Sequence, residues 1–248
     1  MHADEGKKKI GIMGGTFDPI HNGHLQIAAC AKREYQLSEL WFIPAGDPYF
    51  KAGKQVTAPA VRLRMTELAV SPHPDFSCSD IELRRSGPTY TSETLAALQA
   101  LYPSYSFYFI IGADSLFQLE SWHAPEQLFR SAVILCAGRP EESTQADDKA
   151  HGKFNGKFDE KPDIKLDRKF EEKLDVKLDR KFEEKLDAEI TRLNTKYSTA
   201  DCDIRKLHCR PVNISSTMIR KAVSEGRDIS KFVPEPVAAY ISEHGLYQ

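Results

Sequence analysis

Two histidines close a glycine-rich stretch near the N-terminus, GIMGGTFDPIHNGHL (11–25). His21 and His24 are three residues apart where the pattern indicates the start of a helix, so both imidazoles face the same helix end. Gly14 and Gly15 just before them allow close approach of the backbone. A helix N-terminus favours a phosphate through its free N–H groups and its dipole, and imidazole donors add hydrogen bonds to phosphate oxygens. The stretch therefore predicts a phosphate-binding site.

A second polar cluster, ISSTMIRK (214–221), lies near the other end of the chain. Ser215, Ser216 and Thr217 are good N-caps for the helix expected after them. A helix start with hydroxyls, free N–H groups and Arg220 about one turn further on also suits the oxygens of a triphosphate or pyrophosphate. Capping and phosphate binding are compatible, and the sequence leaves both open.

Two common nucleotide-binding motifs are missing from the sequence. The glycines around Gly11 do not form the GxGxxG pattern of dinucleotide oxidoreductases, and no GxxxxGK[ST] phosphate loop occurs. Hydride transfer and P-loop hydrolysis are therefore disfavoured.

The elements that must position these residues alternate between strand and helix. Alternation of this kind predicts an α/β, Rossmann-like, doubly wound and mainly parallel sheet with helices on both faces, which binds ligands beyond the carboxyl ends of its strands. We expect one domain over 1–248, interrupted by a charged insertion at 141–200. The expected strands are 8–13, 40–46, 76–83, 107–114, 132–138 and 203–213, and the expected helices are 24–36, 61–70, 92–102, 125–130, 215–226 and 233–245.

Composition restricts the class of protein. With 34 basic and 36 acidic residues the formal net charge is −2, so no overall field favours nucleic acid or a membrane surface. The N-terminus lacks the apolar stretch of a secretory signal, and the longest apolar runs have the length of strands. We expect a cytoplasmic chain that acts on small molecules.

The five cysteines are odd in number and scattered, which favours reduced thiols. Cys202, His208 and Cys209 lack the spacing of a metal knuckle, so we expect no zinc site.

The insertion contains a repeat over 153–188, in which nine tetrapeptides follow the form Lys, apolar or Pro, Asp/Glu/Asn, any residue. On an α-helix four residues advance about 400°, so the apolar position drifts by about 40° per tetrad and makes no fixed face. The Leu, Lys and Glu content favours helix over about 163–196, although a period of four also fits a strand. We expect a mobile or loosely helical arm without a catalytic role.

The dispersed motifs together resemble one enzyme family. GGTFDPIHNGHL, FIPAG, DIELRRSGPTYTSETL, FIIGADSL, SWH and ISSTMIR occur in the order and rough spacing of bacterial nicotinate-nucleotide adenylyltransferases, members of the nucleotidyltransferase superfamily with HxGH and ISSTxxR motifs. The resemblance covers about 8–140 and 203–248. Two local departures concern phosphate contacts near Lys51: PYFK (48–51) replaces the common PPHK, and VRL (61–63) replaces HRL.

The resemblance implies transfer of the adenylyl group of ATP to nicotinate mononucleotide, which gives deamido-NAD and pyrophosphate in NAD biosynthesis. His21, His24, Lys51 and Arg220 would stabilise phosphate charge. Mg²⁺ would be carried by the ATP phosphates rather than fixed by protein ligands, with Asp18 and Asp114 the nearest carboxylates. Asp18 alone also fits a turn residue, and Asp114 a helix cap. The ATP-binding residues would be Gly14, Gly15, Thr16, Phe17, His21, His24, Gly112, Asp114, Ile214, Ser215, Ser216, Thr217 and Arg220.

The resemblance also implies a site for the pyridine mononucleotide. Trp122 would stack on the pyridine ring, although an isolated tryptophan at this spacing is more often a core residue. Thr89 to Thr91 and His123 lie where the family reads the nicotinate carboxylate. The residues of this site would be Asp18, Lys51, Thr89, Tyr90, Thr91, Trp122 and His123.

Other functions stay open at this point. A related adenylyltransferase acting on nicotinamide mononucleotide or phosphopantetheine would share the two phosphate motifs. A non-catalytic nucleotide-binding regulator would keep the fold, although the intact His21, His24 and Arg220 argue against it. The sequence gives neither the oligomeric state nor the role of the repeat.

Overall fold

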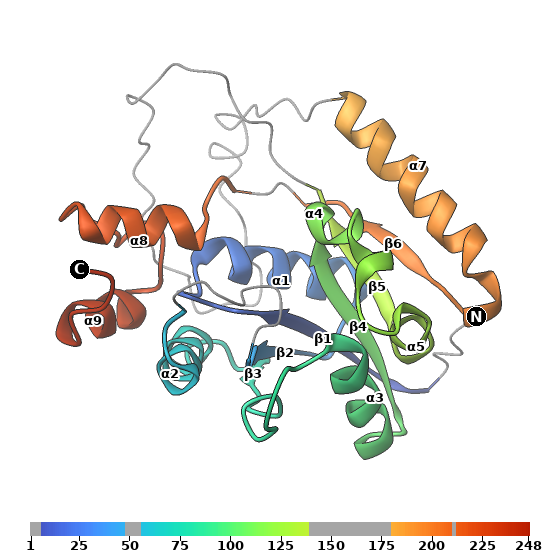
Figure 1. Ribbon diagram of the computed structural model, residues 1–248, viewed down its shortest axis with the longest axis horizontal. Coiled ribbons are helices and arrows are strands. Elements are labelled where there is room, and N and C mark those ends of the chain that lie inside the picture. The colour runs from blue at the N-terminus through green and yellow to red at the C-terminus, as the bar shows by residue number, and fades with distance from the viewer. Residues whose placement is uncertain (1–5, 48–55, 139–179, 210–211) are drawn as a thin grey trace.

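The computed structural model describes residues 6–47, 56–138, 180–209 and 212–248. Its centre is a six-stranded parallel sheet in the order β3-β2-β1-β4-β5-β6 (Figure 1). The strands are β1 (Lys8–Gly15), β2 (Glu39–Pro44), β3 (Phe76–Cys78), β4 (Tyr105–Gly112), β5 (Val133–Ala137) and β6 (Ile204–Leu207). The strand order reverses between β1 and β4, and ligands of such sheets bind outside the carboxyl ends at this point.

Helices cover both faces of the sheet. The longer ones are α1 (Asn22–Tyr35), α2 (Pro59–Val70), α3 (Thr91–Leu101), α5 (Pro125–Ser131), α7 (Arg180–Lys196), α8 (Ser216–Ser224) and α9 (Glu235–Glu243). One buried cluster joins the sheet to α1, α2, α8 and α9, and a second joins it to α3, α5 and α7. The prediction of a doubly wound α/β fold is confirmed.

Buried apolar runs form the central strands, as the sequence predicted. In β4 the segment from Ser106 to Ile111 is buried on both faces, and all five residues of β5 are buried. Two helix starts use prolines of the sequence, Pro59 in α2 and Pro125 in α5, where a missing N–H costs no hydrogen bond. A third proline, Pro234, is the N-cap of α9.

Two strands are shorter than expected by five or more residues. The strand predicted over 76–83 ends at Cys78, because Leu83 and Arg84 N–H donate to the Asp80 carbonyl and turn the chain. The strand predicted over 203–213 ends at Leu207, where the backbone N–H of His208 donates to Glu34 instead of to the sheet.

The end of the repeat forms an ordered helix. Helix α7 includes the last two tetrads and packs beside the edge strand β6 (Figure 1). Counting Tyr197 directly after the helix, the apolar positions are separated by four, four, three and four residues, close to a helical turn, so they share one face. The prediction of no fixed apolar face is therefore wrong for this part, since the strict period of four ends at residue 188. The residues of this face are Phe182, Leu186, Ile190, Leu193 and Tyr197.

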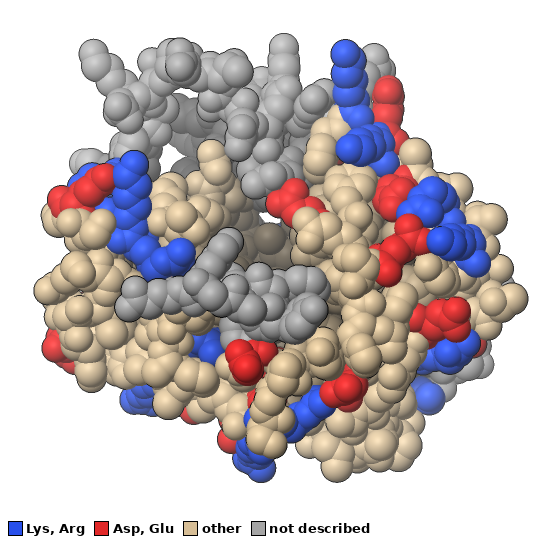
Figure 2. All heavy atoms as spheres, in the orientation of Figure 1, with Lys and Arg blue, Asp and Glu red and all other residues tan. Residues whose placement is uncertain are grey.

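The rest of the predicted insertion, 141–179, lies outside the described residues, so its boundary at 141 stays a proposal. On the face drawn in Figure 2, acidic and basic side chains lie interspersed over α7. All five cysteines are free thiols, as expected. Among the described residues no helix is both long enough and apolar enough to cross a membrane.

Candidate active site

The loop between β1 and α1 lies at the carboxyl edge of the sheet, beside the reversal of strand order. Phe17 takes a left-handed conformation with φ +49° and is buried, with its ring edge-on to His24 at 5.0 Å between centroids. Gly15 is required by this packing, because a Cβ there would lie 2.8 Å from the Phe17 ring. On the other side of β1, a Cβ at Gly14 would lie 3.3 Å from the ring of Phe109.

The two histidines stack at the start of α1. His21 is the N-cap residue, and its ring lies 3.6 Å from that of His24, at an interplanar angle of 20°. The backbone N–H of His21 donates to Nδ1 of His24 over 3.2 Å. A neutral imidazole carries one proton, so this contact assigns it to Nε2 of His24 and makes Nε2 the ring's donor. Gly23 leaves room for the pair, since a Cβ there would lie 3.1 Å from Nδ1 of His21.

Both rings are held neutral near pH 7. Burial lowers the pKa of His21 to about 4. Burial, followed by the influence of His21, lowers the pKa of His24 well below 6.5. The pair therefore contributes N–H donors rather than two positive charges.

This pKa depression predicts a loss of stability in acid. The unfolded chain takes a proton on His21 near pH 6.5 and the folded chain only near pH 4, so the free energy of unfolding falls as the pH drops through that window, by ~3 kcal/mol for His21. Urea unfolding at about pH 7 and about pH 4.5 measures the loss. His21→Gln should lose less stability than the wild type, whereas exposed His244→Gln should match it. Equal losses in His21→Gln and wild type would contradict the assignment.

The ISSTMIR motif (214–220) is hydrogen-bonded directly to the loop between β1 and α1. Ser215 caps α8, and its Oγ accepts from the backbone N–H of Met218. Ser216 Oγ donates to the Pro19 carbonyl at 2.9 Å, and Arg220 Nη1 donates to the Asp18 carbonyl at 2.6 Å. Two helix N-termini that are far apart in sequence thus meet at one edge of the sheet.

The side chain of Asp18 is engaged within the protein. Its carboxylate accepts from Tyr247 Oη at 2.7 Å and from the backbone N–H of Thr57 at 3.3 Å, and the residue is buried. Burial and then this hydrogen bond raise the pKa of Tyr247. These contacts make Asp18 a structural anchor of the loop, and its expected contact with the mononucleotide stays a prediction.

Arg62 is a residue of the site that the sequence analysis missed. It is fully buried in α2, and among the described residues its guanidinium donates only to backbone carbonyls. Its four acceptors belong to the β1–α1 loop, the loop after β2 and the segment before α2. The available sequence signal was its position three and four residues before Met65 and Thr66, on the buried face of α2. The acceptors are the carbonyls of Thr16 (2.7 Å), Ala45 (2.6 Å), Gly46 (3.1 Å) and Thr57 (2.8 Å).

Two of the residues expected to bind the mononucleotide, Tyr90 and His123, lie in contact. Tyr90 and His123 stack with ring centroids 4.2 Å apart, although they lie on separate segments. Thr91 begins α3, whose N-terminus therefore lies beside this pair. The ring of Trp122 is 6.4 Å from that of Phe109, the residue that packs on Gly14.

The remaining expected residues fall into three groups. Gly112 ends β4, and exposed Asp114 lies in the short helix α4 (Ala113–Leu116) that follows. Ile214 and Thr217 flank the start of α8, where Thr217 Oγ1 accepts from Arg220 at 3.3 Å. Lys51 and the PYFK segment lie outside the described residues.

The described residues contain no group of three His, Cys, Asp or Glu side chains able to hold a metal ion. Asp114 has an exposed carboxylate just after the carboxyl end of β4. This donor set fits a magnesium ion that keeps its waters and is held mainly by substrate phosphates.

The model of the cytidylyltransferase-like family matches residues 12–222 of this chain. A probable nicotinate-nucleotide adenylyltransferase of Lachnoclostridium phytofermentans is 38% identical over 97% of this chain and 99% of its own length. A counterpart from Dehalococcoides mccartyi is 37% identical, covering 96% and 97%. The chain belongs to the nicotinate-nucleotide adenylyltransferase family. The aligned spans also reach across the region between 140 and 203, which the motif resemblance left out.

The fold has been seen in solved structures. A Plasmodium falciparum nicotinic acid mononucleotide adenylyltransferase, complexed with NaAD, superposes with a TM-score of 0.63, covering 97% of both chains at 19% identity. A Vibrio parahaemolyticus structure described as a putative nicotinate-nucleotide adenylyltransferase has a TM-score of 0.55 at 16% identity.

Proposed function

We propose that this chain transfers the adenylyl group of ATP to nicotinate mononucleotide, forming deamido-NAD and pyrophosphate. One observation carries the proposal: the stacked His21–His24 pair at the start of α1 is joined to the start of α8 by Arg220 and Ser216. Two helix N-termini, a guanidinium and a neutral imidazole donor thereby lie together at the carboxyl edge of the sheet.

The reaction needs positioning and charge stabilisation. An oxygen of the mononucleotide 5′-phosphate attacks the α-phosphorus of ATP, the bond from that phosphorus to the bridging oxygen breaks, and pyrophosphate leaves with the electron pair. No general base is required, because the attacking phosphate is already ionised at neutral pH. The protein lowers the barrier by aligning the two phosphates and by donating hydrogen bonds as charge develops.

Each part of the site has a role in this step. His24 donates from Nε2 to the α-phosphate, His21 supports that ring by stacking, and the start of α8 with Arg220 holds the β- and γ-phosphates. Lys51 adds a positive charge. A Mg²⁺ ion bound with ATP would neutralise phosphate charge, and Asp114 is a carboxylate that could contact its waters. The ATP site also includes Gly14, Gly15, Thr16, Phe17, Gly112, Ile214, Ser215, Ser216 and Thr217.

The pyridine ring would stack on Trp122, and its carboxylate would lie at the N-terminus of α3, beside Thr89, Tyr90, Thr91 and His123. The free N–H groups and the dipole at this helix start favour an anion. Nicotinamide mononucleotide presents an amide donor to the same donors, which leaves hydrogen bonds unmade. A cytoplasmic location stays a prediction.

This arrangement predicts a strong preference for the acid form of the substrate. We expect kcat/KM for nicotinate mononucleotide to exceed that for nicotinamide mononucleotide by about 100-fold. Steady-state release of pyrophosphate with each mononucleotide, at saturating ATP and Mg²⁺, measures the ratio. Equal values for the two would contradict the proposed carboxylate site.

A further inference from the structure

Helix α7, which includes the end of the tetrapeptide repeat, packs against the segment that follows β4. Leu186 and Leu193 are fully buried in the cluster beneath it. Phe182 lies edge-on to Phe117 at 6.1 Å, and Lys185 Nζ lies 4.8 Å from the centre of the same ring. The helix is thus anchored to the protein and also touches the chain between β4 and Trp122.

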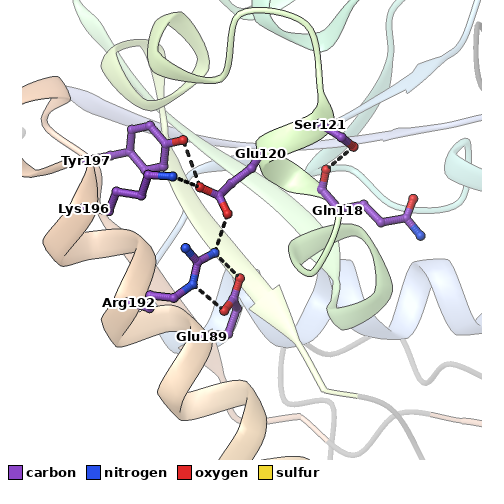
Figure 3. Close-up of polar contacts among 7 residues, drawn as sticks. All are labelled: Gln118, Glu120, Ser121, Glu189, Arg192, Lys196 and Tyr197. Carbon is purple, nitrogen blue, oxygen red and sulfur yellow. Dashed lines mark hydrogen bonds and ion pairs between the residues drawn. The ribbon is translucent and has the colours of Figure 1, made fainter.

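Glu120 is the polar centre of this contact (Figure 3). Its carboxylate accepts from Arg192, from Lys196 Nζ at 2.6 Å and from Tyr197 Oη at 3.0 Å. Arg192 is held in turn by Glu189, with both contacts shorter than 3 Å. The hydrogen bonds from Arg192 and then Lys196 lower the pKa of Glu120 to about 2, so the carboxylate stays ionised across the neutral range.

Backbone hydrogen bonds link Glu120 to Trp122, the residue expected to stack on the pyridine ring. Glu120 is the middle residue of a single 3₁₀ turn, Leu119–Ser121. The N–H of Ser121 donates to the Gln118 carbonyl at 2.9 Å, and the N–H of Trp122 donates to the Leu119 carbonyl at 3.1 Å. A shift of Glu120 therefore moves Trp122 with it.

We propose that Glu120 is a positioning residue for the mononucleotide site, and that α7 holds it so that Trp122 meets the pyridine ring. The inference rests on the proposed function, because it assigns Trp122 to nicotinate mononucleotide. It also gives the end of the repeat a role, since its last two tetrads form the first half of α7. The two phosphate-binding motifs, at the starts of α1 and α8, lie on other segments, so phosphate binding there is independent of this contact.

The test compares Glu120→Ala with Glu126→Ala, a control that breaks the exposed Glu126–Arg130 pair on α5 without touching the 3₁₀ turn. For Glu120→Ala we expect KM for nicotinate mononucleotide to rise about fivefold, with KM for ATP and kcat within about twofold, as for loss of a small charge network. In Glu120→Gln, which keeps the shape of the side chain and an acceptor oxygen, KM for nicotinate mononucleotide should rise less. The control should match the wild type.

Two further measurements distinguish positioning from a general structural role. In the Arg192→Ala background, Glu120→Ala should add little to the KM change, since both substitutions break one network. With Trp41→Phe as background, Trp122 is the only tryptophan, and its fluorescence quenching by nicotinate mononucleotide should need about fivefold more ligand after Glu120→Ala.

An unchanged KM for nicotinate mononucleotide in Glu120→Ala would overturn the inference, as would an equal rise in KM for ATP. Additive effects of Glu120→Ala and Arg192→Ala would also overturn it. If the wild-type protein failed to use nicotinate mononucleotide, the proposed function would fall instead, and the two failures would be distinguished by that first assay.

Discussion

Replacing His24 by alanine is expected to lower kcat by about 10²- to 10³-fold, the effect of removing one preorganised donor to a developing oxyanion. The Nε2–H of His24 is fixed by the hydrogen bond at Nδ1 and by the stacked His21 ring. Because the ring is neutral before ATP binds, its contribution grows as charge moves onto the phosphate oxygens in the transition state. KM for ATP should therefore change much less than kcat.

The control is His244→Ala, an exposed histidine whose ring contacts Tyr240 on its own helix and the carbonyl of that residue. It should keep the wild-type kcat. His24→Asn, which retains an N–H donor near the same place, should recover part of the loss. A wild-type kcat in folded His24→Ala, as judged by circular dichroism, would rule out the assigned role.

Replacing Arg62 by leucine is expected to destabilise the protein by about 3–5 kcal/mol, the usual cost when one partner of a buried charged network is removed. Four backbone carbonyls from three segments lose their donor, and each one left without a partner costs free energy. The loop that carries His21 and His24 loses its attachment at Thr16, so kcat should fall as well. Urea unfolding with a fixed m-value measures the loss of stability.

Arg64→Leu is the matched control, because Arg64 lies two residues further along α2. Among the described residues its ion pair is an exposed one, with Glu67 at 3.2 Å. It should cost less than about 1 kcal/mol. The loss of stability in Arg62→Lys should lie between those of Arg62→Leu and Arg64→Leu, since an ammonium lacks the planar fork that reaches several carbonyls at once. If Arg62→Leu proved as stable as Arg64→Leu, the assigned role of Arg62 would be wrong.

The sequence predicted the part of the site that local chemistry determines. A glycine pair followed by two histidines at helical spacing indicates a phosphate site wherever it follows a buried strand, and His21 and His24 do stack there. The meeting of the two motifs follows from the same rule, because parallel strands end at one edge of the sheet. The alternation of strands and helices predicted the doubly wound sheet but not its strand order, β3-β2-β1-β4-β5-β6.

Individual side-chain contacts between segments far apart in the chain could not be predicted from the sequence. In the sequence Arg62 is indistinguishable from other helical arginines, because its acceptors, the carbonyls of Thr16, Ala45 and Gly46, lie on other segments. The carboxylate of Asp18 is occupied by Tyr247, 229 residues away, which neither spacing nor composition indicates.

The repeat shows a different limit of sequence reasoning. A strict period of four over 153–188 gives no fixed face on a helix, because the apolar position drifts with each tetrad. The helix that forms, Arg180–Lys196, begins near the end of the repeat and continues beyond it, where the spacing changes. The buried face includes Leu186 within the repeat and Leu193 beyond it, so it depends on residues on both sides of the repeat's end.

The most direct test of the central claim follows the α-phosphorus of ATP. With ATP labelled at that atom, nicotinate mononucleotide and Mg²⁺, we predict that the label enters deamido-NAD in a one-to-one ratio with pyrophosphate released, and that neither product forms without the mononucleotide. Label released as AMP or ADP independently of the mononucleotide, or ATP bound without any turnover, would contradict the claim.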